Sequence, residues 1–362
     1  MFITLKNSLK NLTWTDSLSF LMRGLEFFLR SSLKLRLGKV DKEILEELVF
    51  KKLGARRRDI VLGPSFGEDA GVVKSDNRLI VVSCDPITGA SERIGWLSVH
   101  INANDVAVCG GRPACFSPII LLSKDADRVE LERIVNDIHN ACVELGVGVV
   151  TGHTEVAPNI SHSIVCGFMM GPLVSSKPIR SGGGRPGDLI VMSKTAGIEG
   201  TAILARDFRE RLKDKISGEV LEKAERYYEK ISVVNEALKL ARMGVVTAMH
   251  DPTEGGVLGG VYELAEASNT SFIIYEDRIP VSVETRQICN ALGCDPLKLI
   301  SSGVLLACVS KKNVKRIEKL GFNVIGELRE RKMPSILMRS DKTEEKITGQ
   351  VLDELWRIYE ES

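Results

Sequence analysis

Hydrophobic and polar positions follow two periodicities along the chain, and together they predict a first unit of helices and strands over residues 41–178. Residues 126–145 show the helical period, with Val129, Ile134, Ile138 and Val143 as the apolar positions. Short apolar runs bounded by Gly, Pro or polar residues predict strands. The expected elements are helices at 41–52, 92–110 and 126–145, and strands at 79–84, 117–123, 147–151 and 163–170.

A polar connection rich in Gly and Pro, residues 175–188, separates this unit from a second one over residues 179–345. The second unit again mixes both periods and shows no tandem repeat of fixed length. Its expected strands are LIVMS, VVTAM, SFIIY, VLLACV and a run near 322. Its expected helices begin near 198, cross 219–243, begin again at 253, and recur at 284–292 and near 312. A last helix is expected within 346–362.

The first forty residues differ from the rest of the chain in charge. Seven basic residues against Asp16 and Glu26 give this extension +5 and leave −4 for the remainder. Apolar residues at helical spacing around Arg23 and Arg30 predict a basic amphipathic helix. We expect it to dock on the protein itself or on a partner subunit, and contact with a membrane surface is the disfavoured alternative. Charges within the apolar run argue against a signal peptide.

Composition narrows the function classes. The chain has 362 residues, 44% hydrophobic, 27% charged and 5% aromatic, with net charge +1, which is typical of a globular protein. The near-neutral charge and the scarcity of aromatic residues argue against nucleic acid as a partner. Eight cysteines lie mostly in apolar runs without metal-binding spacing, so we expect reduced thiols and a cytoplasmic protein. An uninterrupted apolar run of membrane-spanning length is absent from the sequence.

Glycine-rich segments do not reveal a standard nucleotide motif. The run GGGRPG at 182–187 matches the letters of the dinucleotide fingerprint, but Pro186 and a predicted strand follow it where a helix should begin. The sequence also lacks the P-loop pattern. A bound nucleotide would therefore be held in another way.

Acidic residues carry the remaining chemical signal. They occur in four groups: Glu68–Asp69 on a Gly-flanked loop, Asp85 after an apolar strand, Asn104–Asp105 within a helix, and Asp251 in the run HDPTEGG. Asp105 shares a helical face with Leu97 and Ile101, so we expect it to be buried. A buried carboxylate requires a cation, a metal or several hydrogen-bond donors. A metal site and a hydrogen-bonded structural pair both satisfy that requirement.

The run HDPTEGG allows two interpretations. Asp251, Pro252 and Glu254 have the spacing of a helix-capping box. Gly255 and Gly256 would weaken the first turn of that helix, and close approach of a ligand to the backbone would explain them. A helix start with free amides also suits a phosphate. Two further turns add polar groups: TGHTE (Gly152, His153, Thr154, Glu155) and KTAGIEGT, with Lys194 and Gly197.

The order of these motifs resembles the AIR synthase (PurM-like) superfamily over residues 42–340. The motifs that carry the resemblance are GEDAGVV, strand-end Asp85, NANDVAVCGGRP, TGHTE, GDLIVMSKTAGIEGT and HDPTEGG. The resemblance implies an α+β, α/β architecture of two domains, with a ferredoxin-like N-terminal unit that dimerises through its sheet and a C-terminal α/β unit. It also implies that ATP and Mg²⁺ bind through acidic residues in the cleft between them.

Residue by residue, the resemblance implies metal ligands at Asp69, Asp85 and Asp105, a nucleotide or metal contact at Asn104, and a further carboxylate at Asp251. Glu68 and Glu155 join the expected metal set. His153 stands where the family commonly has Asp, which makes Mn²⁺ or Zn²⁺ an alternative to Mg²⁺. The chain ends in WRIYEES without the terminal Cys of the hydrogenase-maturation protein HypE, and it lacks the Cys-Lys element of selenophosphate synthetase. Those two activities are disfavoured.

We therefore expect a metal-dependent phosphoryl-transfer enzyme that binds ATP or another small phosphate compound, and forms a homodimer. Asp105, Asp251 and Lys194 are the expected catalytic residues, and Mg²⁺ or Mn²⁺ the expected metal. The expected ligand-binding positions are Asn104, Gly152, His153, Thr154, Gly197, Gly255 and Gly256. A phosphatase that transfers the phosphoryl group to water is one alternative. A non-catalytic nucleotide-binding scaffold is the other.

Overall fold

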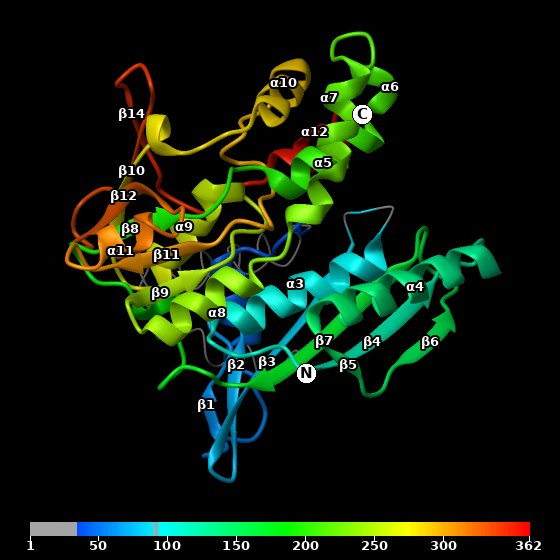
Figure 1. The fold of residues 1–362 in the computed structure, drawn as a ribbon, viewed down its shortest axis with the longest axis horizontal. Helices are drawn as coiled ribbons and strands as arrows, with labels where there is room; N and C mark the ends of the chain where they lie inside the picture. Colours follow the sequence, from blue (N-terminus) through cyan, green and yellow to red (C-terminus); the bar gives the residue numbers. More distant parts are fainter. Residues whose placement is uncertain (1–34, 89, 91–92) are drawn as a thin grey trace, which may run out of the picture. The chain divides into compact units, whose positions relative to one another are not determined.

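The computed structural model describes residues 35–88, 90 and 93–362, and the chain divides into two units, residues 1–40 and residues 41–362. The amphipathic helix predicted for the first unit lies outside the described residues. Every element named below belongs to the second unit (Figure 1). Its described helices include none that is long and apolar enough to span a membrane.

The first sheet has seven strands and is mainly antiparallel. Its order is β1-β2-β3-β7-β4-β5, and β6 also pairs with β4. Only β5 and β6 run parallel to their neighbour, β4. The strands are β1 (Ile60–Leu62), β2 (Gly71–Ser75), β3 (Arg78–Ile87), β4 (Cys115–Leu122), β5 (Gly148–Val149), β6 (His153–Val156) and β7 (Ile164–Pro172).

Two helices, α3 (Ile94–Val108) and α4 (Arg128–Leu145), lie over this sheet (Figure 1). α3 packs against β3, β7 and α4, and every one of its residues is buried. α4 is amphipathic and half-exposed. It begins where the Asp127 side chain accepts a hydrogen bond from the Glu130 amide, and it ends at left-handed Gly146. The short helix α2 (Lys42–Ile44) and the π-helix η1 (Leu45–Val49) precede the sheet.

The second sheet also has seven strands, in the order β14-β13-β10-β12-β8-β11-β9. All its neighbours are antiparallel except β10 and β13. The central strands β8 and β11 are almost entirely buried, which explains their continuous apolar sequence. The strands are β8 (Leu189–Met192), β9 (Val246–His250), β10 (Ser271–Tyr275), β11 (Leu306–Val309), β12 (Asn323–Arg329), β13 (Ile336–Met338) and β14 (Glu344–Lys346).

Two groups of helices accompany the second sheet. α5, α7 and α10 pack together, α9 packs against β9 and β10, and α8 packs against both β9 and α3 (Figure 1). α8 therefore connects the two sheets. The elements are η2 (Ser181–Gly183), α5 (Ile198–Asp207), α6 (Arg209–Leu212), α7 (Gly218–Glu225), η3 (Arg226–Lys230), α8 (Val234–Met243), α9 (Gly256–Ala267), η4 (Glu276–Arg278), α10 (Val283–Leu292), α11 (Val314–Glu318) and α12 (Glu354–Glu360).

Three local predictions are wrong. β3 continues to Ile87, so Asp85 lies inside a strand and pairs with Gly167 instead of following the strand. The expected helix over 219–243 is divided into α7, η3 and α8. The capping box at Asp251 does not form, because α9 begins only at Gly256 and left-handed Gly255 precedes it.

Candidate active site

Asp105 lies at the buried centre of the candidate site. It sits on α3, which packs against β3, and only 4% of its surface is exposed. Ser83 of β3 donates a hydrogen bond to Asp105 Oδ2 (2.5 Å). Because side chains two apart on a strand share a face, Ser83 and Asp85 point the same way. Asn102 fixes the position of Asp85: its Oδ1 accepts from the Asp85 amide at 2.8 Å, and its Nδ2 donates to the Asp85 carbonyl at 3.1 Å.

Three carboxylates from distant parts of the chain act on Asp105 through their negative charges. Burial raises its pKa well above the ordinary value, and the negative charges of Asp251, Asp85 and Asp69 raise it further. The hydrogen bond from Ser83 acts in the opposite direction. The four aspartates come from four separate segments of the chain. Their mutual repulsion favours a cation among them.

Asp69 belongs to a buried ionic network with His250. His250 Nδ1 lies 2.6 Å from Asp69 Oδ1 in an ion pair, and its Nε2 donates to Glu263 Oε2 (3.1 Å). Burial alone would lower the pKa of His250, but the charges and hydrogen bonds of Asp69 and Glu263 outweigh it and raise that pKa to about 10. The imidazolium form is therefore held between the two carboxylates. It joins the β1–β2 connection to the end of β9.

Glu68 and Asp69 are both joined to the segment that enters the second sheet. Ser181 donates from its hydroxyl to Asp69 Oδ2 (3.0 Å) and from its amide to Glu68 Oε2 (3.2 Å). Arg180 Nε donates to Glu68 Oε1 (2.9 Å). Glu68, expected as a metal ligand, therefore holds Arg180 and Ser181 instead of facing Asp105.

Asn104 and Lys194 bind main-chain groups of one loop. Asn104 Nδ2 donates to the Ile231 carbonyl (3.0 Å), and its Oδ1 accepts from the Val233 amide (2.8 Å). Lys194 Nζ donates to the carbonyls of Lys230 (2.9 Å) and Ser232 (2.6 Å). Both side chains fix the connection between η3 and α8, although the sequence indicates ligand contacts for them.

The glycines at the starts of α5 and α9 are required by the protein's own backbone. Gly255 and Gly256 both have left-handed φ angles, +79° and +64°. A Cβ on Gly256 would lie 2.6 Å from the Leu297 carbonyl oxygen, and one on Gly255 would lie 2.7 Å from the Val351 carbonyl oxygen. Gly197 is left-handed as well and precedes α5. Close packing explains these residues without a ligand.

The TGHTE turn lies on a different part of the first sheet. All four residues of β6 are exposed, and His153 Nε2 lies 3.3 Å from Glu155 Oε2. Thr154 pairs with Ile120 of β4 in the parallel ladder. Gly152 precedes this strand, and a Cβ there would lie 2.9 Å from the Pro118 carbonyl oxygen. None of the charges that act on Asp105 comes from this strand.

Among the described residues, no group of three or more His, Cys, Asp or Glu side chains is arranged to hold a metal ion by itself. The sequence-predicted set therefore separates into three parts. Asp69, Asp85, Asp105 and Asp251 interact electrostatically, Glu68 is engaged with Arg180, and Glu155 lies on the exposed strand. Magnesium is commonly held by one or two carboxylates together with substrate phosphates and water, so the aspartate set fits a nucleotide-bound metal.

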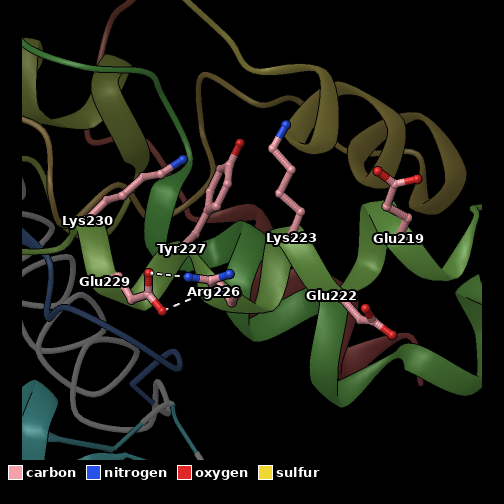
Figure 2. A pocket seen from close by; sticks show the side chains of 7 residues that line it. All are labelled: Glu219, Glu222, Lys223, Arg226, Tyr227, Glu229 and Lys230. Carbon is pink, nitrogen blue, oxygen red and sulfur yellow. Dashed lines mark hydrogen bonds and ion pairs between the residues drawn. The ribbon is translucent and has the colours of Figure 1, made fainter.

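A separate open pocket of about 420 Å³ lies on α7 and η3. Figure 2 shows its lining of long charged side chains, with Arg226 paired to Glu229. Lys230 Nζ lies 3.6 Å from the centre of the Tyr227 ring, a cation–π contact. None of the four aspartates lines this pocket.

Sequence reasoning missed His250, Glu263, Ser83 and Ser181 as parts of the site. Ser83 could have been found from the strand period, because it stands two residues before Asp85. His250 precedes Asp251 in a motif that the sequence singled out, but nothing in the sequence indicates that Asp69 and Glu263 are its partners. Those contacts arise only in the folded chain.

The segments that form the two sheets each match the model of a known domain family. The model of the AIR synthase related protein N-terminal domain matches residues 67–173, and that of the C-terminal domain matches residues 185–338. A protein of Methanocaldococcus jannaschii named for hydrogenase expression and formation is 30% identical over 290 residues, covering 77% of this chain and 82% of that protein. Thiamine-monophosphate kinase of Pyrococcus horikoshii is 28% identical over 278 residues, covering 74% and 84%. Carbamoyl dehydratase HypE of Cupriavidus necator is 32% identical over 216 residues, 59% of each chain.

Solved structures show the same architecture. AaThiL complexed with AMPPCP and TMP superposes with a TM-score of 0.69 at 20% identity, covering 88% of this chain and 99% of that one. The hydrogenase maturation protein HypE in complex with ATP gives a TM-score of 0.66 at 22% identity, covering 90% and 98%. The fold is thus the PurM-like arrangement of two α/β domains. This chain belongs to the AIR synthase-related family.

Proposed function

We propose that the protein is an ATP-dependent phosphoryl-transfer enzyme whose reacting phosphates lie against Asp85, Asp105 and Asp251. The observation that supports the proposal is that carboxylates from three separate segments raise the pKa of buried Asp105 through their charges. Relatives support ATP as the nucleotide, because one similar HypE was solved with ATP and one similar ThiL with AMPPCP and TMP.

The aspartate set fits a divalent metal bound together with the nucleotide, either Mg²⁺ or Mn²⁺. Carboxylates alone would repel phosphate, and their mutual repulsion at Asp105 is relieved by a cation. When bound, such a metal neutralises charge on the phosphate oxygens. Asn102 fixes the main chain of Asp85, and Ser83 fixes the carboxylate of Asp105. Neither residue therefore needs to reorganise when the ligand binds.

His250 has a positioning role in this proposal. The positive charge of His250 neutralises Asp69, which also accepts a hydrogen bond from Ser181. The acidic side chains that remain for the phosphate site are Asp85, Asp105 and Asp251. Lys194 and Asn104 act on the same site from outside, by fixing residues 230–233. Neither side chain has to touch phosphate for this role.

The proposal is tested by replacing Asp105 with Asn, which preserves the size of the side chain, removes its charge and keeps one acceptor oxygen for Ser83. Purified protein is incubated with ATP, Mg²⁺ or Mn²⁺ and thiamine monophosphate or a simple phosphate ester, and labelled phosphate is followed. We expect Asp105→Asn to reduce ATP turnover by about 10²-fold or more, in line with the loss of one electrostatic group in an active site. Circular dichroism checks that the variant is folded.

A matched control is Asp188→Asn, which replaces another buried aspartate, one bound by Thr247 Oγ1 (2.7 Å) on the second sheet. The control should keep its turnover. Full metal-dependent activity in Asp105→Asn would contradict the proposal. Phosphate release from a non-nucleotide ester, without ATP, would identify a phosphatase instead.

We also propose a homodimer through the open face of the first sheet. Side chains that alternate with the buried positions of β4 lie on the other face of the sheet, and among them Ile119 is 46% exposed. The family resemblance implies dimerisation through this sheet, and Ile119 is the large apolar side chain that such a contact would cover. Light scattering of the native chain should give the dimer mass, and Ile119→Lys should shift it toward the monomer. A monomeric native chain would contradict this proposal.

A further inference from the structure

The end of α10 brings two cysteines into contact. Gly293 adopts a left-handed conformation (φ +68°), and its amide donates to the Cys289 carbonyl. The Cys294 amide donates to the same carbonyl oxygen (3.0 Å). This bond from the second residue beyond the helix back to its last turn is typical of a Schellman ending, in which the side chains at the two positions frequently make contact. Here both positions are cysteines.

We propose that Cys289 and Cys294 form a reversible disulfide, which makes the end of α10 a redox-modified site. The main chains at the two residues are already within hydrogen-bond distance, and disulfides join Cα atoms about 4.4–6.8 Å apart. Both thiols are free in this structure. The bond can therefore close without unwinding the helix.

The two thiols differ in a way that gives each a part in the reaction. Cys289 is fully buried, and its interaction with the Cys294 thiol, together with burial, strongly raises the pKa of Cys289. Cys294 is only partly buried. Negative charges of Asp295 and Glu354 face Cys289, and the Arg357 guanidinium donates to the Gly293 carbonyl between the two cysteines. Cys294 is consequently the thiol that an external reagent reaches.

The co-reactant is a low-molecular-weight disulfide such as oxidised glutathione. The Cys294 thiolate attacks one glutathione sulfur, which forms a mixed disulfide and releases one glutathione thiolate. The Cys289 thiol then attacks the Cys294 sulfur, and its proton goes to the second glutathione thiolate as that group leaves. Two protein thiols are oxidised, and one glutathione disulfide is reduced to two thiols.

The location gives the bond a structural consequence. The segment directly after Cys294 supports the starts of two helices: the Leu297 carbonyl accepts from the Leu258 amide of α9 (3.0 Å), and the Ile300 carbonyl accepts from the Gly200 amide of α5 (3.0 Å). A disulfide at Cys294 would restrain residues 295–300 at their N-terminal end. We expect hydrogen exchange at Leu258 and Gly200 to become slower on oxidation.

Mass spectrometry of the full chain tests the proposal. Trypsin cleavage after Arg286 and Lys298 releases one peptide, residues 287–298, with Cys289 and Cys294 as its only cysteines. After incubation with oxidised glutathione and alkylation of free thiols, this peptide should lack two hydrogen atoms and carry no alkyl group. Dithiothreitol should reverse the change.

Two variants make the result decisive. Cys294→Ser should abolish the intrapeptide bond, whereas Cys84→Ser, which removes an exposed cysteine on β3, should leave it intact. The proposal is overturned if both cysteines of the peptide are alkylated under conditions that already modify Cys84 with glutathione. A glutathione adduct that stays on Cys294 without closing would also overturn it. Unchanged hydrogen exchange in the oxidised protein would refute the link to α5 and α9.

Discussion

Replacement of Asp353 by Asn should change how the stability of the protein depends on pH. Asp353 connects the C-terminal segment to the start of α9: its Oδ2 accepts from the Gly255 amide (2.6 Å) and its Oδ1 from the Leu355 amide (2.8 Å). Burial raises its pKa from 3.8 to about 7, and the negative charge of Glu254 adds a smaller increase. The two hydrogen bonds act in the opposite direction. The folded chain thus binds a proton more tightly than the unfolded chain does.

The sign of the effect follows from linkage. Because the pKa is raised in the folded state, the stabilising contribution of the proton is present below about pH 4 and is lost as pH rises toward 7. At about 1.4 kcal/mol per pH unit, the wild-type chain should lose about 2 kcal/mol of unfolding free energy from this group between pH 5 and pH 7. Asp353→Asn cannot titrate and should not show that loss.

The substitution also lowers the free energy of unfolding by an amount that does not depend on pH. Asn offers one acceptor oxygen in place of two, so one of the two amides faces an NH₂ group, at about 1–3 kcal/mol. Urea unfolding followed by circular dichroism at pH 5, 6 and 7 separates the two effects. We expect Asp353→Asn to be the less stable protein at pH 5, with the difference shrinking by about 2 kcal/mol at pH 7. A difference that stays constant across these pH values would refute the reasoning.

Two other substitutions test the packing and the buried histidine. Gly256→Ala should lower the free energy of unfolding by about 2–4 kcal/mol, because the new Cβ would meet the Leu297 and Leu299 carbonyls and the φ angle is left-handed. The control Gly244→Ala, at a left-handed position with open space around it, should lower it by about 1 kcal/mol. Equal shifts in Tm for the two variants would contradict this prediction. His100 is fully buried against Trp96, and burial lowers its pKa to about 3. Because His100 stays neutral in the folded chain and is protonated in the unfolded chain, the protein should lose stability as pH falls from 6.5 toward 3. The Tm of His100→Phe should therefore decline less steeply with acid than that of the native chain. Parallel declines would exclude His100 as the cause.

The sequence predicts the fold further than it predicts the site. Strands and helices with a clear period, such as α4 and β7, are found close to their expected positions, and the helical face of Leu97, Ile101 and Asp105 is buried as predicted. The predicted start of α9 is wrong. The motif at Asp251 satisfies the capping pattern, but the helix begins at Gly256, whose left-handed backbone packs closely against Leu297.

The partners of charged side chains could not be predicted, because they lie far apart along the chain. Lys194 reaches the Lys230 carbonyl, and Asp69 reaches His250. Local spacing indicates the residue types that a phosphate site needs, but it does not distinguish a side chain that faces a ligand from one that holds a loop. His153 illustrates the same limit, since its motif resembles the others but its strand lies at the exposed edge of the sheet.

The contact between Asp69 and His250 bears on how such an enzyme could move. A hinge that opened the two sheets at this point would expose an imidazolium and its carboxylate partner separately, after both had been removed from water. Breaking a buried pair in this way costs several kcal/mol, which is more than a small ligand gains from a few new contacts. Ligand entry is therefore expected to depend on the loops around the acidic residues, while the frame that carries those residues stays rigid.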